Sequence, residues 1–229
     1  MATITPYSIA VGSEGFITFG LISAAVIGML LGPLPGSVAV LIGSYVGIAV
    51  YPQAGVLGWF TPLATGAGAL AAGALRSGKG YVVGMIYPCA ILLYAISPIA
   101  PLAPWFLWLH LIVLPLALTT LTPGVSGVFK RGFSESTTSS RILFIALAAF
   151  LAVMTDNIVG SAIAAHYLPI VGLTIPFVAA IFNGVVLIYP VERIVAAIIV
   201  TLVVSALLRA LRNTPLIDMF EPWSEDGAH

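Results

Sequence analysis

The sequence predicts an all-α fold, a polytopic helical bundle that lies in a membrane. Hydrophobic residue types make up 60% of the 229 residues and charged types only 7%, whereas a soluble domain carries about 25% charged residues. Several apolar runs approach or exceed the roughly 20 residues that a helix needs to cross the hydrocarbon core. Strands are not expected, because these runs are long and lack a two-residue alternation of polar and apolar side chains.

Six segments are predicted to be spanning helices, and two more apolar segments are shorter. The predicted spans are 14–31, 57–75, 81–98, 104–122, 142–165 and 190–212. The shorter segments, 35–51 and 172–189, are bounded by proline and glycine and are expected to be re-entrant or tilted. Residues 1–212 then form one transmembrane domain, and 213–229 form a polar, acidic C-terminal tail. No cleavable signal peptide is expected, because the N-terminus lacks a basic region followed by an apolar core.

The basic residues predict the orientation. They fall into three groups: Arg76 and Lys79; Lys130, Arg131 and Arg141; Arg209 and Arg212. Cytoplasmic loops carry an excess of Lys and Arg, so all three groups, and with them the C-terminus, are expected on the cytoplasmic side of the cell membrane. Segment 172–189 then begins and ends outside. Segment 35–51 either does the same, with a cytoplasmic N-terminus, or spans the membrane, with the N-terminus outside.

The first helix carries small residues at a spacing of four: Gly20, Ala24, Gly28 and Gly32. Such rows let helix backbones approach closely in lipid. They indicate either internal packing or a docking stripe for another subunit. Gly43 and Gly47 form a similar pair in the next segment.

Helix 142–165 carries Asp156 and Asn157 in the middle of an apolar run. Asp156 shares a face with small residues at a spacing of four, so it is expected to face a tightly packed neighbour rather than lipid. The members of this row are Ala149, Ala152, Asp156, Gly160 and Ala164.

The last helix opens with "YPVERIV", which places Glu192 and Arg193 in its first turn. An Asp156–Arg193 pair would lower the free-energy cost of burying both charges. Two interpretations follow. The pair pins two helices, or Asp156, Asn157, Glu192 and Arg193 line an outward-facing pocket for a small molecule, since ionisable residues inside membranes are functional by default.

The sequence gives no sign of metal binding, nucleic-acid binding or catalysis. Cys89 is the only cysteine, and the histidines lack ligand spacing, so neither a metal site nor a cofactor is expected. The net charge of zero gives no sign of nucleic-acid binding. Without a recognisable nucleophile arrangement, the chain is not expected to be an enzyme. His166, at the end of helix 142–165, and Asn183, in segment 172–189, complete the candidate substrate-binding set.

The layout resembles the substrate-binding (S) components of energy-coupling factor transporters, particularly archaeal ones. Four features carry the resemblance: "LGPLPGSVAVLIGSYVG" at 31–47, the small-residue row of helix 14–31, "TDNIVGSAIAA" at 155–165 and "YPVERIV" at 189–195.

The resemblance implies a six-helix core that binds a vitamin-like molecule from outside. It further implies that Gly20, Ala24 and Gly28 dock on a membrane coupling (T) protein, which is driven by two cytoplasmic ATPases. Asp156, Asn157, Glu192 and Arg193 would lie at or near the pocket.

Two other functions stay open from the residues alone. In the first, the chain is a structural subunit of a larger membrane complex, and Asp156 only holds two helices together. In the second, it is a small secondary carrier, in which Asp156 titrates to couple protons.

Overall fold

The computed structural model describes residues 6–9, 16–18, 20–134 and 138–211. The predicted tail at 213–229 and the basic residue Arg212 lie outside these residues. The described part is helical apart from a short antiparallel hairpin of β1 (Pro6–Ile9) and β2 (Phe16–Thr18). The all-α expectation is therefore confirmed at the level of fold class.

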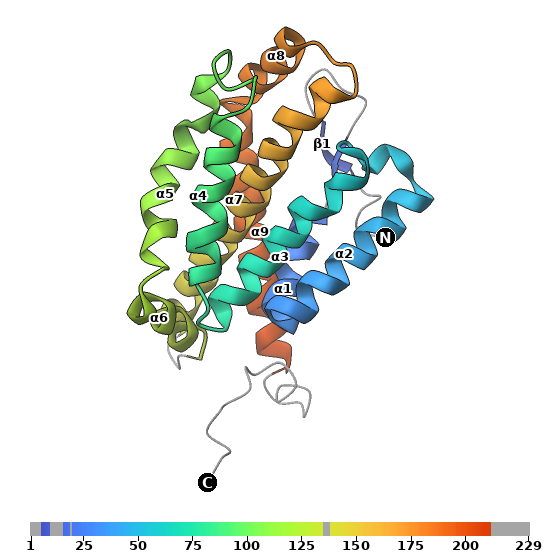
Figure 1. The fold of residues 1–229 in the computed structure, drawn as a ribbon. Helices are drawn as coiled ribbons and strands as arrows, with labels where there is room; N and C mark the ends of the chain where they lie inside the picture. Colours follow the sequence, from blue (N-terminus) through green and yellow to red (C-terminus); the bar gives the residue numbers. More distant parts are fainter. Residues whose placement is uncertain (1–5, 10–15, 19, 135–137, 212–229) are drawn as a thin grey trace.

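The longer helices form one bundle around α7 (Figure 1). Their bounds are α1 Gly20–Leu31, α2 Pro33–Val50, α3 Thr61–Arg76, α4 Tyr81–Ala95, α5 Trp108–Thr119, α6 Pro123–Ser134, α7 Thr138–Ile170, α8 Ile175–Val185 and α9 Ile188–Leu211. Three short 3-10 turns lie at η2 Pro52–Ala54, η3 Gly58–Phe60 and η4 Pro104–Leu107.

Three helices of the described part are long and apolar enough to cross a membrane: α2, α7 and α9. A fourth span arises if η4–α5 and the following α6, which meet at 92°, are counted as one broken span. The six predicted spans are not confirmed, because α1 and α4 are short apolar helices. Backbone geometry explains the shortness of α1, since Gly32 adopts φ 87° and Pro33 starts a new helix directly after it.

The chain direction settles how segment 35–51 runs. Arg76, at the end of α3, donates hydrogen bonds to the carbonyl oxygens of Met29 and Leu30, so α1 and α3 end at the same end of the bundle. Helix α2 leaves from there and reaches the opposite end, where α3 begins (Figure 1). The segment therefore traverses the bundle. The alternative in which it begins and ends on one side is wrong, and 172–189 alone stays at one end as α8.

Helix α3 is the hub for close packing, because its small residues admit the backbones of its neighbours. A Cβ atom on Gly28 of α1 would overlap the carbonyl group of Ala69, and one on Gly73 would lie 2.5 Å from the carbonyl carbon of Gly32. Ala24 is only 1% exposed.

The small-residue row of α1 thus packs inside the protein. The prediction that Ala24 and Gly28 dock on a partner is corrected, because α3 covers them; Gly20, at the start of the row, is only partly buried. Gly43 behaves differently, since no atom lies within 4 Å of a Cβ built on it.

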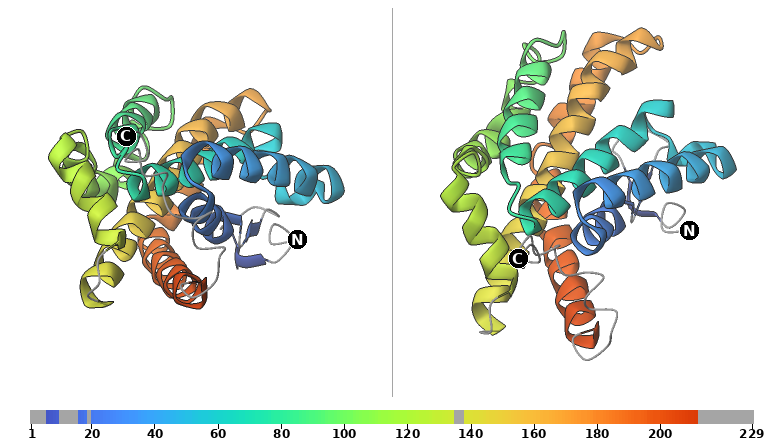
Figure 2. Two further views of the ribbon diagram at one scale, coloured as in Figure 1. Left: turned by 90° about the horizontal axis from the view of Figure 1, so that it is seen from below. Right: turned by 60° about the horizontal axis from the view of Figure 1, so that its bottom comes forward.

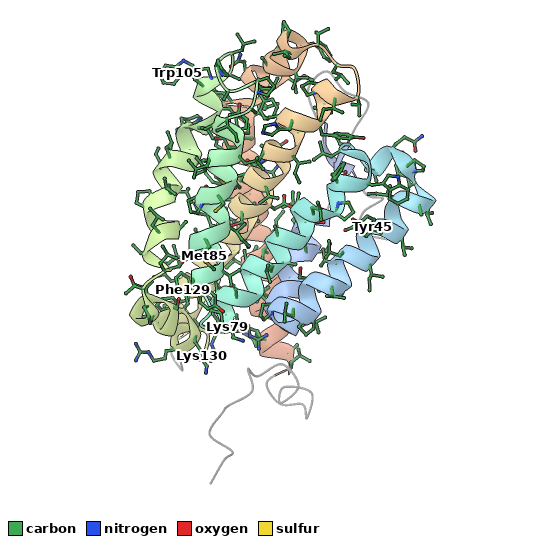
Figure 3. The ribbon with its side chains drawn as sticks, viewed as in Figure 1. Tyr45, Lys79, Met85, Trp105, Phe129 and Lys130 are labelled. Atoms are coloured by element: carbon green, nitrogen blue, oxygen red, sulfur yellow. The ribbon has the colours of Figure 1, made fainter. Side chains whose placement is uncertain are left out.

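The nine charged residues of the described part separate into two places. Six cations lie at the end where α1, α3, α5 and α9 finish and α6 crosses (Figures 1 and 2). They are Arg76, Lys79, Lys130, Arg131, Arg141 and Arg209. The other three form a single cluster within the bundle. The opposite end of the described chain carries no charged residue but bears exposed aromatic side chains. Among them are Trp59 in η3 and Trp105 in η4, of which Figure 3 labels Trp105.

Candidate functional site

Helix α7 positions Asp156 against the small residues of α3. A Cβ atom on Gly68 would lie 3.0 Å from the Cβ of Asp156, and one on Gly160 would lie 3.2 Å from the Cβ of Ala64. Asp156 is 9% exposed. The expectation that its face meets a tightly packed neighbour is confirmed, and the neighbour is α3.

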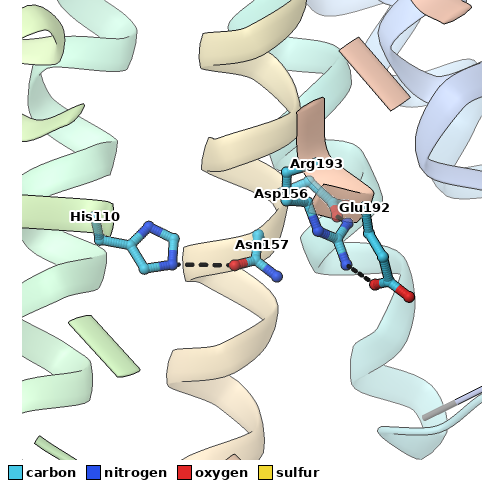
Figure 4. Close-up of polar contacts among 5 residues, drawn as sticks. All are labelled: His110, Asp156, Asn157, Glu192 and Arg193. Atoms are coloured by element: carbon cyan, nitrogen blue, oxygen red, sulfur yellow. Dashed lines mark hydrogen bonds and ion pairs between the residues drawn. The ribbon is translucent and has the colours of Figure 1, made fainter. Parts of the chain in front are cut away.

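Helix α9 brings Arg193 and Glu192 to the same place (Figure 4). Nη1 of Arg193 lies 3.9 Å from Oδ2 of Asp156, and Nη2 lies 3.9 Å from Oε2 of Glu192. The side chain of Arg193 is 4% exposed, that of Asp156 12% and that of Glu192 19%. We call these three residues the charge cluster. It places two carboxylates against one guanidinium, so its formal charge is −1 when all three groups are ionised.

The charge cluster is incompletely hydrogen-bonded. Oδ1 of Asp156 and Nε of Arg193 are both buried and have no hydrogen-bond partner among the described residues. Distances of 3.9 Å are also longer than a hydrogen bond between charged groups. A buried acceptor and a buried donor without partners each cost about 1–3 kcal/mol, so the cluster is short of at least one polar partner.

Asn157 belongs to a second polar arrangement on the other side of α7. Its Oδ1 accepts a hydrogen bond from Nε2 of His110 at 3.0 Å, and Nδ1 of His110 lies 2.9 Å from the hydroxyl of Tyr87 (Figure 4 shows the first contact). Because an amide oxygen can only accept, His110 carries its proton on Nε2 when neutral, and Tyr87 donates to Nδ1.

Aromatic rings enclose His110, which is fully buried. The ring of Tyr189 stacks on it at 5.7 Å between centroids, and Phe106 lies at the same centroid distance. Tyr189 donates its hydroxyl proton to the carbonyl oxygen of Phe106. This packing fixes the imidazole, so His110 holds the side chain of Asn157 in one orientation.

Sequence reasoning missed His110. Its partners Tyr87 and Asn157 lie 23 and 47 residues away on other helices. A single histidine in an apolar run carries no spacing signal that would reveal such a contact. The usable hint is that a fully buried histidine in a membrane helix needs polar partners for both ring nitrogens.

His166 and Asn183 do not join the charge cluster. Nε2 of His166 donates to the carbonyl oxygen of Leu93, and Nδ2 of Asn183 donates to that of Leu102. His166 lies ten residues after Asp156 on α7, which corresponds to about 15 Å along the helix axis. Both side chains therefore tie α7 and α8 to the end of α4 and to the connection that follows it, at the uncharged end.

Metal binding has no support in the part of the chain that the structure describes, where no group of three His, Cys, Asp or Glu side chains could hold an ion. The candidate site therefore consists of the charge cluster. Asn157, predicted to line one pocket with Asp156, Glu192 and Arg193, does not join it, because its side chain bonds to His110 on the other side of α7.

Comparisons with known proteins give one relative. A protein of Methanocaldococcus jannaschii, named uncharacterized protein MJ0923, is 27% identical over 145 residues, which cover 63% of this chain and 47% of that protein. The chain thus spans about half the length of this relative. No protein-family model matches the chain, and no solved structure matches it. Function therefore has to be inferred from the charge cluster itself.

Proposed function

We propose that this protein is the membrane-embedded substrate-capture subunit of an uptake transporter, of the kind found as S components of energy-coupling factor systems. The charge cluster on α7 and α9 contacts the bound solute. The solute is a small, vitamin-like molecule. The chain itself catalyses no reaction.

One observation carries this proposal: buried polar atoms of the charge cluster lack partners. A pin between two helices needs only one carboxylate and one guanidinium with good hydrogen bonds. Here Oδ1 of Asp156 and Nε of Arg193 are left over. Leftover buried donors and acceptors are expected where a ligand completes the hydrogen bonding. This favours a binding site over the purely structural interpretation.

The proposed orientation places the basic end of the bundle in the cytoplasm of the cell, in line with the excess of Lys and Arg in cytoplasmic loops. Helix α9 then ends on the cytoplasmic side, and α8 lies outside. A coupling protein and its ATPases would bind from the membrane and the cytoplasm. Their contact does not use Ala24 and Gly28, because α3 covers these residues.

Native mass spectrometry of the purified protein tests the proposal. Wild type is compared with Asp156→Asn and with Thr155→Val, a matched control on the neighbouring buried position whose hydroxyl bonds only to the carbonyl of Leu151. We expect a co-purified small molecule with wild type and the control, and its loss from Asp156→Asn. The capture function is refuted if no small molecule co-purifies with folded wild type and if Asp156→Asn is as well folded in detergent as wild type.

A secondary carrier is the second candidate, favoured by the two carboxylates that share one guanidinium. Such a pair of acids can take up one proton when the cluster changes its exposure between the two sides of the membrane. Reconstituted vesicles containing a pH dye distinguish the candidates. Proton uptake that depends on Asp156 and needs no ATPase supports a carrier, and its absence supports a capture subunit.

A further inference from the structure

We propose that the charge cluster recognises a neutral amide edge on its solute, that is, a carbonyl group next to an N–H group. This inference rests on the proposed capture function and names the chemistry of the molecule that is captured. It is carried by two buried atoms of opposite hydrogen-bonding character, Oδ1 of Asp156 and Nε of Arg193.

The two atoms require different partners. A carboxylate oxygen can only accept a hydrogen bond, and the N–H of a guanidinium group can only donate one. Both atoms are buried without a hydrogen-bond partner among the described residues, and Asp156 and Arg193 are themselves buried. A ligand that completes the charge cluster therefore brings one donor for Asp156 and one acceptor for Arg193.

The donor and the acceptor have to lie close together on the ligand. Nη1 of Arg193 lies 3.9 Å from Oδ2 of Asp156, so the carboxylate and the guanidinium that carry the two unpartnered atoms face each other. The carboxylate is held in place, because the Cβ of Asp156 packs against Gly68 of α3. A lactam, in which the N–H and the C=O belong to one amide group and point to the same side, meets this requirement.

The charge cluster is not sealed from outside the protein. The side chain of Asp156 is 12% exposed and that of Glu192 is 19% exposed, whereas that of Arg193 is only 4% exposed. A small polar group can therefore approach past the two carboxylates, with Arg193 at the inner end of its path.

Other ligand charges fit the two atoms less well. An anion would accept from Arg193 but would be repelled by Asp156, and a cation would meet the reverse situation. A zwitterion supplies both partners, but both of its charges must lose their hydration in a buried site, which is costly. A neutral amide loses much less on burial once its N–H and C=O are hydrogen-bonded.

Saturation-transfer difference NMR on the full chain in detergent tests the inference with three small probes. γ-Butyrolactam carries the amide edge, its N-methyl derivative lacks the N–H donor, and γ-aminobutyrate is the zwitterion obtained when the ring is opened. Empty detergent micelles give the background signal. We expect wild type to bind the lactam at least about tenfold more tightly than the N-methyl derivative, because methylation leaves Oδ1 of Asp156 without a donor.

Two variants test the two atoms one at a time. Arg193→Lys keeps the positive charge but has no Nε, and Asp156→Asn replaces the charged acceptor by a neutral one. Each should weaken lactam binding by about five- to tenfold. Thr155→Val, whose hydroxyl bonds only to the carbonyl of Leu151, is the matched control and should bind as wild type does. The comparison of the two lactams on wild type needs no variant, so it decides the question even if a variant does not fold.

Three results would overturn the inference. They are equal binding of the two lactams, tighter binding of γ-aminobutyrate, and no specific binding of the lactam, as expected if one ordered water, which both donates and accepts, completes the cluster. The capture function fails separately, when no small molecule co-purifies with wild type. A co-purified molecule without an amide N–H would overturn this inference alone.

Discussion

Replacing Gly28 by alanine tests the contact between α1 and α3. The added Cβ atom would lie 2.8 Å from the Cα of Ala69 and would overlap its carbonyl group. Carbon atoms pack at about 3.5–4.0 Å, so the shortfall is about 1 Å. The atoms in the way belong to a backbone and cannot rotate aside, so α1 and α3 have to separate. Overpacking of this kind costs about 1–3 kcal/mol, and we expect the upper end of that range.

Gly43→Ala is the matched control. It makes the same chemical change on the adjacent helix α2, where no atom lies within 4 Å of the new Cβ. Alanine is favoured over glycine inside a helix by about 0.5–1 kcal/mol, so this variant should be as stable as wild type or slightly more stable.

Thermal unfolding in detergent, followed by circular dichroism, provides the measurement. A loss of about 3 kcal/mol lowers the melting temperature of a chain of this size by about 6–12 °C. We expect that drop for Gly28→Ala and no drop for Gly43→Ala. Equal melting temperatures for the two variants would show that α1 does not pack on α3 through Gly28.

Two further predictions concern the buried polar residues. Arg193→Met leaves the buried carboxylate of Asp156 without its cation and should destabilise the protein by about 3–5 kcal/mol. Adding Asp156→Asn should restore part of the loss. Denaturant unfolding of both variants measures this, beside Thr201→Val, a control whose hydroxyl bonds to Ala197 of its own helix. Full additivity of the two substitutions would contradict the ion pair. His110→Phe keeps the aromatic packing but leaves Oδ1 of Asn157 and the hydroxyl of Tyr87 without their hydrogen-bond partner, so the free energy of unfolding should fall by about 1–3 kcal/mol. Adding Tyr87→Phe to this variant should lower it little further. A further loss equal to that of Tyr87→Phe in wild type would contradict the hydrogen bond between Tyr87 and His110.

The sequence predicted the class of protein and the meeting of α7 with α9 because both depend on local chemistry. A membrane bundle follows from composition. A charged side chain inside an apolar helix needs a partner of opposite charge, so the sequence predicted that Asp156 pairs with Arg193. Segment 172–189 was also correctly predicted to stay at one end, since both neighbouring helices were oriented by basic residues.

The remaining features depend on which helix faces which. A row of small residues predicts that another helix packs closely against it but does not identify that helix. From the sequence alone, Gly28 could equally have faced a second protein. Arg76 was expected to be a loop cation, yet it is buried against the last carbonyl groups of α1. Long-range contacts of this kind leave no local pattern, and the course of 35–51 depended on one of them.

The separation of charge between the two ends bears on how the chain enters a membrane during synthesis. The connections that reach the uncharged end lie at 51–60, 96–107 and 171–187, and none of them contains a charged residue. In the proposed orientation, each helical hairpin can be inserted without moving a lysine or arginine across the bilayer, a step that costs about 2.3 kcal/mol per charge for each 100 mV of membrane potential. Of the charged residues in the described ranges, the charge cluster alone has to enter the hydrocarbon. Asp156 enters with the α7 arm of the last hairpin, and Glu192 and Arg193 enter with its α9 arm, so the opposite charges arrive together.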